Sequence, residues 1–216
     1  MNWPIKERDK INYKIPTLTL DTNHVALRSP SMLGTLYNGL YQLEYNYFYK
    51  QNIELCVTPE TDFEITQGIP LENLGVEAYN RFSKTRLFKA RPAGTTLDLV
   101  NDEPNVLWYD TRKILWPNIS DSLLNRNQIA DVNQLFFHTA LSGSLSNSAF
   151  ITTDTNFHTH AKDIYNQLGV KVKYSYEAWD WLRNDYGLYV PSEKEIESLY
   201  REQITDSIRR ASEIFK

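Results

Sequence analysis

The stretch TLTLDTN at residues 17–23 decides the fold that the sequence predicts, and FITTDTNF at residues 150–157 has the same form. Each is an apolar, β-branched run that ends abruptly in Asp-Thr-Asn. A run of this kind is typical of a buried strand. Asp21 and Asp154 therefore stand where two strands leave a sheet, and carboxylates at such positions can build a metal site for phosphate chemistry.

Strands and helices alternate along the rest of the chain. We expect strands at 16–21, 53–57, 106–109, 149–153 and 170–174. We expect helices over 29–51, from Thr58, from about 129 to Gly143, over 157–168, from Glu177, and from the capping box Ser192-x-x-Glu195. This order predicts an α/β protein with a mainly parallel sheet, in which binding sites form beyond the carboxyl ends of the strands.

Composition limits the class of protein without naming it. The chain has 216 residues and a net charge of −4, so no overall basic field indicates a nucleic-acid partner. Its single cysteine, Cys56, cannot form an internal disulfide, which favours a reducing, cytoplasmic environment. We find no signal peptide, and no apolar stretch approaches the ~18 residues that a membrane span requires. We therefore expect no membrane partner.

Four acidic residues occur in order along the chain. Asp21 closes the first strand, and Glu64 lies about two turns into the helix after the second strand. Asp131 opens the helix before the next strand, and Asp154 closes that strand. Each has an ordinary explanation, since an Asp after a strand often caps the next helix, and Asp131 fits a charge in the first turn of a helix. Taken together, they predict carboxylates that converge at one sheet edge and repel one another unless cations join them. Ligands that are all oxygen select hard ions such as Mg²⁺ or Mn²⁺.

The motifs around these acids resemble the PIN-domain family of metal-dependent ribonucleases, which includes the toxins of many toxin–antitoxin pairs. LTLDTN at 18–23 is similar to the opening strand of that family, and Val57-Thr58 followed by Glu64 is similar to its second element. ADVNQL at 130–135 resembles the helix with the third acid, and FITTD at 150–154 the segment with the fourth. Glu60 and Asp62 are close rivals of Glu64 for the second position.

The resemblance implies a three-layer α/β/α sandwich and metal-dependent endoribonuclease activity. Asp21, Asp131 and Asp154 would hold one or two Mg²⁺ or Mn²⁺ ions, and Glu64 would bind a metal or orient water. In that site the ion lowers the pKa of a bound water and neutralises charge on the phosphate. Thr22, Asn23 and Thr153 would position water or the ligand carboxylates, with turn and capping hydrogen bonds as their alternative role.

The resemblance covers about 17–69 and 125–182. It implies a nuclease domain over 1–190 with an insertion at about 70–124, followed by a C-terminal helix over 191–216 that packs on the domain or on a partner chain. An antitoxin or a second copy of the chain is the protein partner to consider. The densest basic run holds four residues that could contact the RNA backbone or form a solvated face: Lys84, Arg86, Lys89 and Arg91.

Two other functions compete with a nuclease. An inactive relative could keep the same fold as an RNA- or protein-binding module, and the tryptophans would then be candidates for base stacking. A metal-dependent phosphatase would use a strand-end Asp as nucleophile, but the D-x-D spacing of the commonest such enzymes is absent, because Asp21 is followed by Thr22 and Asn23. We expect His158 and His160 to have surface or core roles rather than to bind zinc, and His24 is the histidine nearest to the predicted site.

Overall fold

The structure of the chain is a computed structural model of residues 1–216. It describes residues 15–26, 35–58, 60–61, 64, 86–87, 106–140, 147–189, 191–192, 194–195 and 198. Strands and helices alternate through these ranges, and the predicted α/β class is confirmed.

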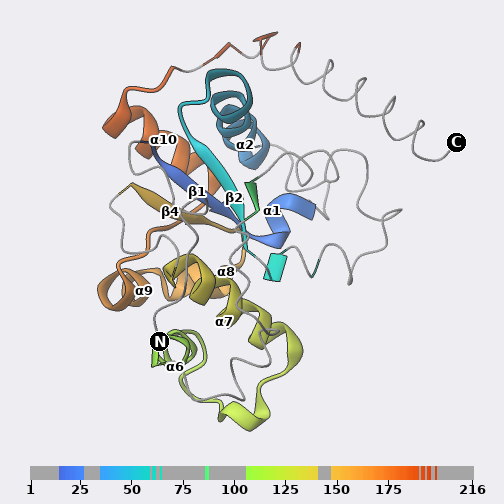
Figure 1. Cartoon of the computed structure of the whole chain (residues 1–216), viewed down its shortest axis with the longest axis vertical. Helices are drawn as coiled ribbons and strands as arrows, with labels where there is room; N and C mark the ends of the chain where they lie inside the picture. Colours follow the sequence, from blue (N-terminus) through green and yellow to red (C-terminus); the bar gives the residue numbers. More distant parts are fainter. Residues whose placement is uncertain are drawn as a thin grey trace, which may run out of the picture.

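The described sheet is parallel throughout, with the strand order β3-β2-β1-β4-β5 (Figure 1). Its central strand β1 (Thr17–Leu20) pairs with β2 (Glu54–Val57) on one side and with β4 (Ser148–Ile151) on the other. Two short strands, β3 (Arg86–Leu87) and β5 (Val172–Lys173), lie at the edges. The order places the two Asp-Thr-Asn strands next to each other, because β1 and β4 are direct neighbours.

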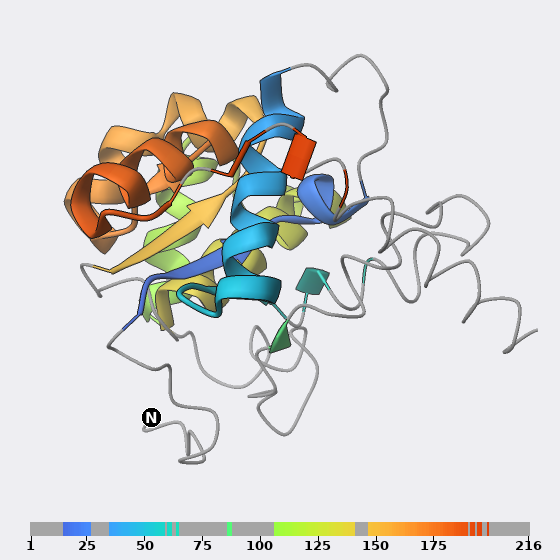
Figure 2. The same ribbon diagram turned by 90° about the horizontal axis from the view of Figure 1, so that it is seen from above.

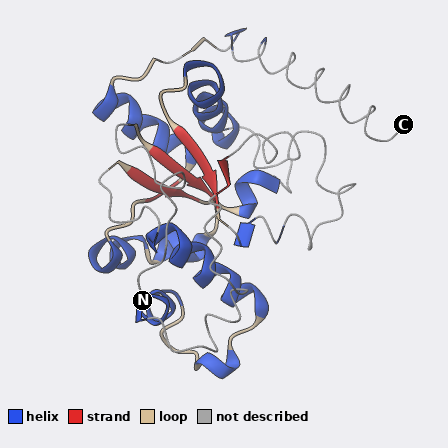
Figure 3. Ribbon diagram, viewed as in Figure 1, coloured by secondary structure: helices blue, strands red, loops and turns tan. Residues whose placement is uncertain are grey.

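Helices cover both faces of the sheet. In Figure 1, α2 and α10 lie on one side of the strands, and α6, α7, α8 and α9 lie on the other. Figure 2 gives the same arrangement from above, with α2 and α10 in front of the strands, and Figure 3 shows the strands in red between two groups of blue helices. Each face therefore has its own apolar core.

The first core forms under α2 (Thr35–Tyr45) and α10 (Ser175–Tyr186). Leu18 and Leu20 face this core because side chains alternate between the two faces along a strand. The two helices pack closely at Gly39, where an added Cβ would lie 2.5 Å from the backbone nitrogen of Tyr176. Only a glycine therefore fits at this point of α2.

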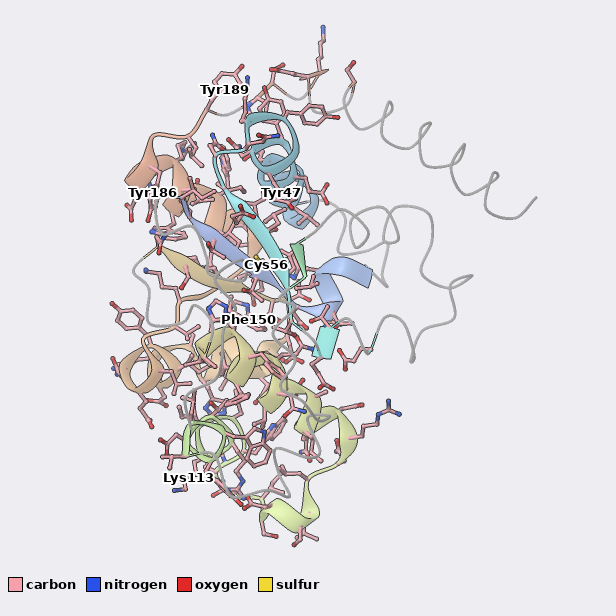
Figure 4. All side chains as sticks on the ribbon, viewed as in Figure 1. Tyr47, Cys56, Lys113, Phe150, Tyr186 and Tyr189 are labelled. Carbon is pink, nitrogen blue, oxygen red and sulfur yellow. The ribbon has the colours of Figure 1, made fainter. Side chains whose placement is uncertain are left out.

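The second core forms under α6 (Val106–Leu115), α7 (Arg126–His138) and α9 (Ala161–Leu168). Phe150 of β4 points into it, and Figure 4 shows this residue on the α7 side of the sheet, away from Tyr47 on the α2 side. These large buried rings hold the helices on this face.

The strand expected at Val106–Tyr109 is wrong, because these residues begin α6. Val106, Trp108 and Tyr109 all favour strands when so short a window is considered. Over a longer window the buried positions Trp108, Thr111, Arg112 and Leu115 follow helical spacing, and this face of α6 packs toward α7. Part of the segment expected as an insertion at 70–124 thus belongs to the second core.

Several expected helix boundaries shift by a few residues or a turn. A π-helical turn, η3 (Asn46–Lys50), follows α2, and the expected start of that helix at 29–34 lies outside the described residues. The helix expected at 157–168 divides into α8 (Thr155–Thr159) and α9 at His160. Gly169 ends α9 with a positive φ of 72°, as the sequence predicts.

The C-terminal helix expected over 191–216 lies almost entirely outside the described residues. Of its capping box, the backbone N–H of Glu195 donates to the Ser192 hydroxyl at 3.3 Å. Among the helices that the structure describes, none is long and apolar enough to cross a membrane.

Candidate functional site

Asp21 and Asp154 follow adjacent parallel strands at their carboxyl ends. Leu20 lies opposite Ile151 in the register of β1 and β4, so both strands end at the same level. The backbone N–H of Asp21 donates to the carbonyl of Ile151 at 2.9 Å, which continues the pairing one residue further. The structure thus brings the first and fourth predicted acids to one edge of the sheet.

Thr152 connects these two residues. Its hydroxyl donates a hydrogen bond of 2.7 Å to Oδ2 of Asp21 and accepts one of 3.0 Å from the backbone N–H of Asp154. Asn23 Nδ2 also donates to Asp21 Oδ2, at 3.3 Å. Thr152 is completely buried and Asp21 is only 3% exposed, so the Asp21 carboxyl group depends on these donors for its solvation.

Asp154 also has the ordinary role expected of an Asp after a strand. It is the N-cap of the short helix α8, and its Oδ1 accepts a hydrogen bond of 2.7 Å from the backbone N–H of Asn156. Asp21 stands in a similar place before α1 (Thr22–Ala26), where its carbonyl accepts from the N–H of His24 at 3.0 Å.

Glu64 is held in the same region by two polar side chains. The hydroxyl of Thr22 donates to Oε2 of Glu64, and Nε2 of Gln134 donates to the same oxygen at 3.0 Å. Gln134 Nε2 also lies 3.2 Å from the Thr22 hydroxyl oxygen, so the three side chains form one cluster. Thr22 and Gln134 come from α1 and α7, two helices far apart in the sequence.

Glu60, the first rival of Glu64, has a different environment. It is buried and accepts a hydrogen bond of 3.2 Å from Asn133 Nδ2, and Asn133 Oδ1 in turn accepts from Trp108 Nε1 at 2.9 Å. These partners belong to α7 and α6, on the side of the second core. The other rival, Asp62, lies outside the described residues.

Asp131 lies in the second turn of α7, which begins at Arg126 behind an Asn125–Gln128 capping box. The expectation that Asp131 opens this helix is therefore wrong, and so is its alternative as a charge in the first turn. It precedes Gln134 by three residues, a spacing that puts both side chains on the same side of the helix.

The four acids influence one another electrostatically. Burial raises the pKa of Asp131 to about 8, and the charges of Asp154, Asp21 and Glu64 add to this rise. Burial also raises the pKa of Asp21 to about 6, with further contributions from the charges of Glu64 and Asp154, although the Thr152 hydrogen bond opposes the rise. The charges of the predicted acids thus act on Asp21 and Asp131 in this part of the structure.

The carboxyl groups of the described acids are not arranged as a complete set of metal ligands. Within the described ranges, no group of three or more His, Cys, Asp or Glu side chains is arranged so that it could hold a metal ion. The donor chemistry does fit a hard cation, because the acids offer only oxygen ligands. A bound divalent cation would also offset the repulsion from neighbouring carboxylates, which adds to the rise that burial causes in the pKa of Asp21 and Asp131.

The remaining predicted residues are only partly described. Thr22 and Asn23 contact the acids, whereas Thr153 has no hydrogen bond of its side chain among the described residues. Arg86 lies in β3, and the other three residues of the basic run lie outside the described part: Lys84, Lys89 and Arg91. His24 is buried, and its backbone N–H donates to the carbonyl of Asp21.

Two residues of the cluster were missed from the sequence, Thr152 and Gln134. Gln134 is a polar residue on the apolar side of an amphipathic helix, three positions after Asp131, and that was a usable signal. The choice of Thr152 rather than Thr153 as the donor to Asp21 depends on the register of β4 against β1.

In comparisons with known proteins, no protein-family model, no curated protein and no solved structure matches the chain.

Proposed function

We propose that this protein is a metal-dependent ribonuclease of the PIN type, with a three-layer α/β/α domain that hydrolyses RNA phosphodiester bonds. The observation that carries the proposal is that Asp21 and Asp154 follow adjacent parallel strands at the same sheet edge, with Glu64 hydrogen-bonded to Thr22 next to Asp21. Their mutual effect on the pKa values of Asp21 and Asp131 supports it. RNA is the substrate and Mg²⁺ or Mn²⁺ the cofactor of this proposal.

Asp21, Asp131 and Asp154 would hold the cation, and Glu64 would bind it or orient water. When bound, Mg²⁺ or Mn²⁺ lowers the pKa of a coordinated water and neutralises charge on the phosphate. The protein supplies fixed carboxylates at the sheet edge. Thr152 restrains Asp21 through its 2.7 Å hydrogen bond, and Gln134 restrains Glu64 through its 3.0 Å hydrogen bond.

Cleavage of a broad RNA panel by the purified full-length chain tests this function. We expect cleavage with Mg²⁺ or Mn²⁺, none with excess chelator, and a loss of about 100-fold or more for Asp21→Asn, since even outer-shell changes cost 10–100-fold at metal sites. Asp163→Asn, an exposed acid in the first turn of α9, is the matched control and should cleave normally. Absence of metal-dependent cleavage across the panel would overturn the proposal.

A catalytically inactive binding module on the same fold is the second candidate. The observation that favours it is that the described carboxylates do not form a ready coordination shell. RNA or protein binding that is unchanged by Asp21→Asn, together with no detectable Mn²⁺ binding by calorimetry, would support this candidate over the nuclease.

A further inference from the structure

Three aromatic side chains stack at the sheet edge where the predicted acids Asp21 and Asp154 lie. We call these two acids, with Glu64 and Asp131, the acidic cluster. The ring centroids of His158 and Tyr174 are 3.6 Å apart with an angle of 9° between their planes. Those of Tyr174 and Tyr176 are 5.5 Å apart with an angle of 7°. Three nearly parallel rings from α8, the end of β5 and α10 thus form one continuous stack, which we call the aromatic stack.

The aromatic stack is linked directly to the residues that hold Asp21. Nε2 of His158 lies 3.0 Å from the carbonyl oxygen of Thr152, and because a carbonyl can only accept, the ring N–H donates. The hydroxyl of the same Thr152 donates to Asp21. One residue therefore separates the aromatic stack from the first predicted acid.

Sheet register places the aromatic stack at the same edge as the acids. Ile151 of β4 lies opposite Lys173 of β5, so Tyr174 leaves the sheet where Thr152 does. The N–H of Thr152 continues this pairing by donating to the carbonyl of Lys173 at 3.1 Å. A strand of nucleic acid with a phosphate at the acids would pass this edge.

The backbone that carries the two tyrosines is restrained. Tyr174 N–H donates to Oε2 of Glu177 at 2.9 Å, and the Tyr174 carbonyl accepts from the N–H of Ala178 at 2.9 Å. The Tyr176 backbone lies against Gly39 of α2. Tyr176 is nevertheless 41% exposed, so a fixed aromatic ring remains accessible at this end of the aromatic stack.

We propose that the aromatic stack binds a nucleobase of single-stranded RNA next to the phosphate held at the acidic cluster, with Tyr176 as the ring in contact with the base. This inference deepens the proposed ribonuclease function and rests on it. Stacking on an aromatic ring suits any base, because every base has a π-face, so the site selects a single strand rather than a sequence. Bases paired and stacked within a duplex would not reach the ring.

Binding of a labelled single-stranded RNA oligonucleotide, measured by fluorescence anisotropy, tests this site. Full-length Asp21→Asn with Mg²⁺ serves as background, so that turnover does not consume the probe. Adding Tyr176→Ala should weaken binding about 5- to 150-fold, the equivalent of the ~1–3 kcal/mol typical of one stacked base. Tyr176→Ala should have little effect on the affinity for an abasic strand of equal length. Tyr176→Phe should keep the affinity for the intact strand.

Tyr165→Ala is the matched control, since Tyr165 is an exposed tyrosine of α9 that belongs to no described ring stack. It should leave both affinities unchanged. The site is overturned if Tyr176→Ala binds the intact strand normally, if it weakens the abasic strand equally, or if the background protein binds no single-stranded RNA.

The two proposals can fail separately. Metal-dependent cleavage by the chain with native acids, combined with unchanged binding in Tyr176→Ala, would refute the aromatic site and leave the nuclease in place. Base-dependent binding that requires Tyr176, without cleavage of any RNA, would support the aromatic site and refute the nuclease.

Discussion

The hydroxyl of Thr152 donates a 2.7 Å hydrogen bond to Oδ2 of Asp21, although 131 residues separate the two in the sequence. The contact arises because β1 and β4 are parallel neighbours that end at the same level. Thr152 also accepts from the N–H of Asp154, so a single hydroxyl fixes the geometry of both strand-end acids.

Thr152→Val should disturb the site more than its near-isosteric shape suggests. The change removes the hydrogen bond that lowers the pKa of Asp21, so this pKa should rise further above about 6, and carboxyl NMR titration measures it. Under the proposed function, Mn²⁺ affinity measured by calorimetry should fall about 10- to 100-fold. Thr153→Val is the adjacent control, and equal effects of the two changes would contradict this role of Thr152.

Gln134→Leu should release Glu64. Leucine is similar in size and can fill this buried position, which is 2% exposed. The change removes the side-chain N–H that donates to Glu64 and Thr22. We expect RNA cleavage to fall about 10- to 100-fold, as for other residues that orient a ligand. Asn127→Leu, at an exposed position of the same helix, should have no such effect, and unchanged cleavage by Gln134→Leu would show that Glu64 needs no support.

Stability of the metal-free protein should fall as pH rises from about 6.5 to about 8. Asp131 has a pKa of about 8 in the folded chain, well above the ordinary value, so over this range the folded state holds a proton that the unfolded state has lost. Stability decreases with pH wherever the folded state binds more protons. His138 affects only lower pH, because burial lowers its pKa to about 3.

Thermal unfolding in chelator checks this slope, and Asp131→Asn isolates it. The variant should be more stable than the native chain at pH 8, because the native chain has to ionise this buried carboxyl group as the pH approaches about 8. The difference between the two proteins should shrink toward pH 4. If the difference in stability between the two proteins stays constant with pH, the ionisation of Asp131 does not cause the pH dependence.

Gly39→Ala should destabilise the packing of α2 on α10. The new Cβ would lie 2.5 Å from the backbone nitrogen of Tyr176, which a rigid backbone cannot accommodate. We expect a loss of about 1–3 kcal/mol in denaturant unfolding, as for other overpacked sites. The comparison is Gly187→Ala, where the Cβ meets open space but φ is +62°, and about 1 kcal/mol of strain is expected there. A neutral Gly39→Ala would contradict the close approach.

Where a single element had a clear period, the sequence was sufficient to predict it. The apolar runs identified β1, β2 and β4, and Gly169 marked the end of α9. The error at Val106–Tyr109 came from a window too short to separate strand propensity from helical spacing. The break at His160 had no comparable sequence signal.

For the site, the sequence by itself determined which acids follow the strands, because the end of a buried apolar run is visible without any partner strand. Only the tertiary structure decided that Thr152 rather than Thr153 reaches Asp21, and that Gln134 reaches Glu64. Those choices depend on strand register and on how α7 lies over the sheet. Both are set by packing between segments far apart in the chain, which no local pattern records.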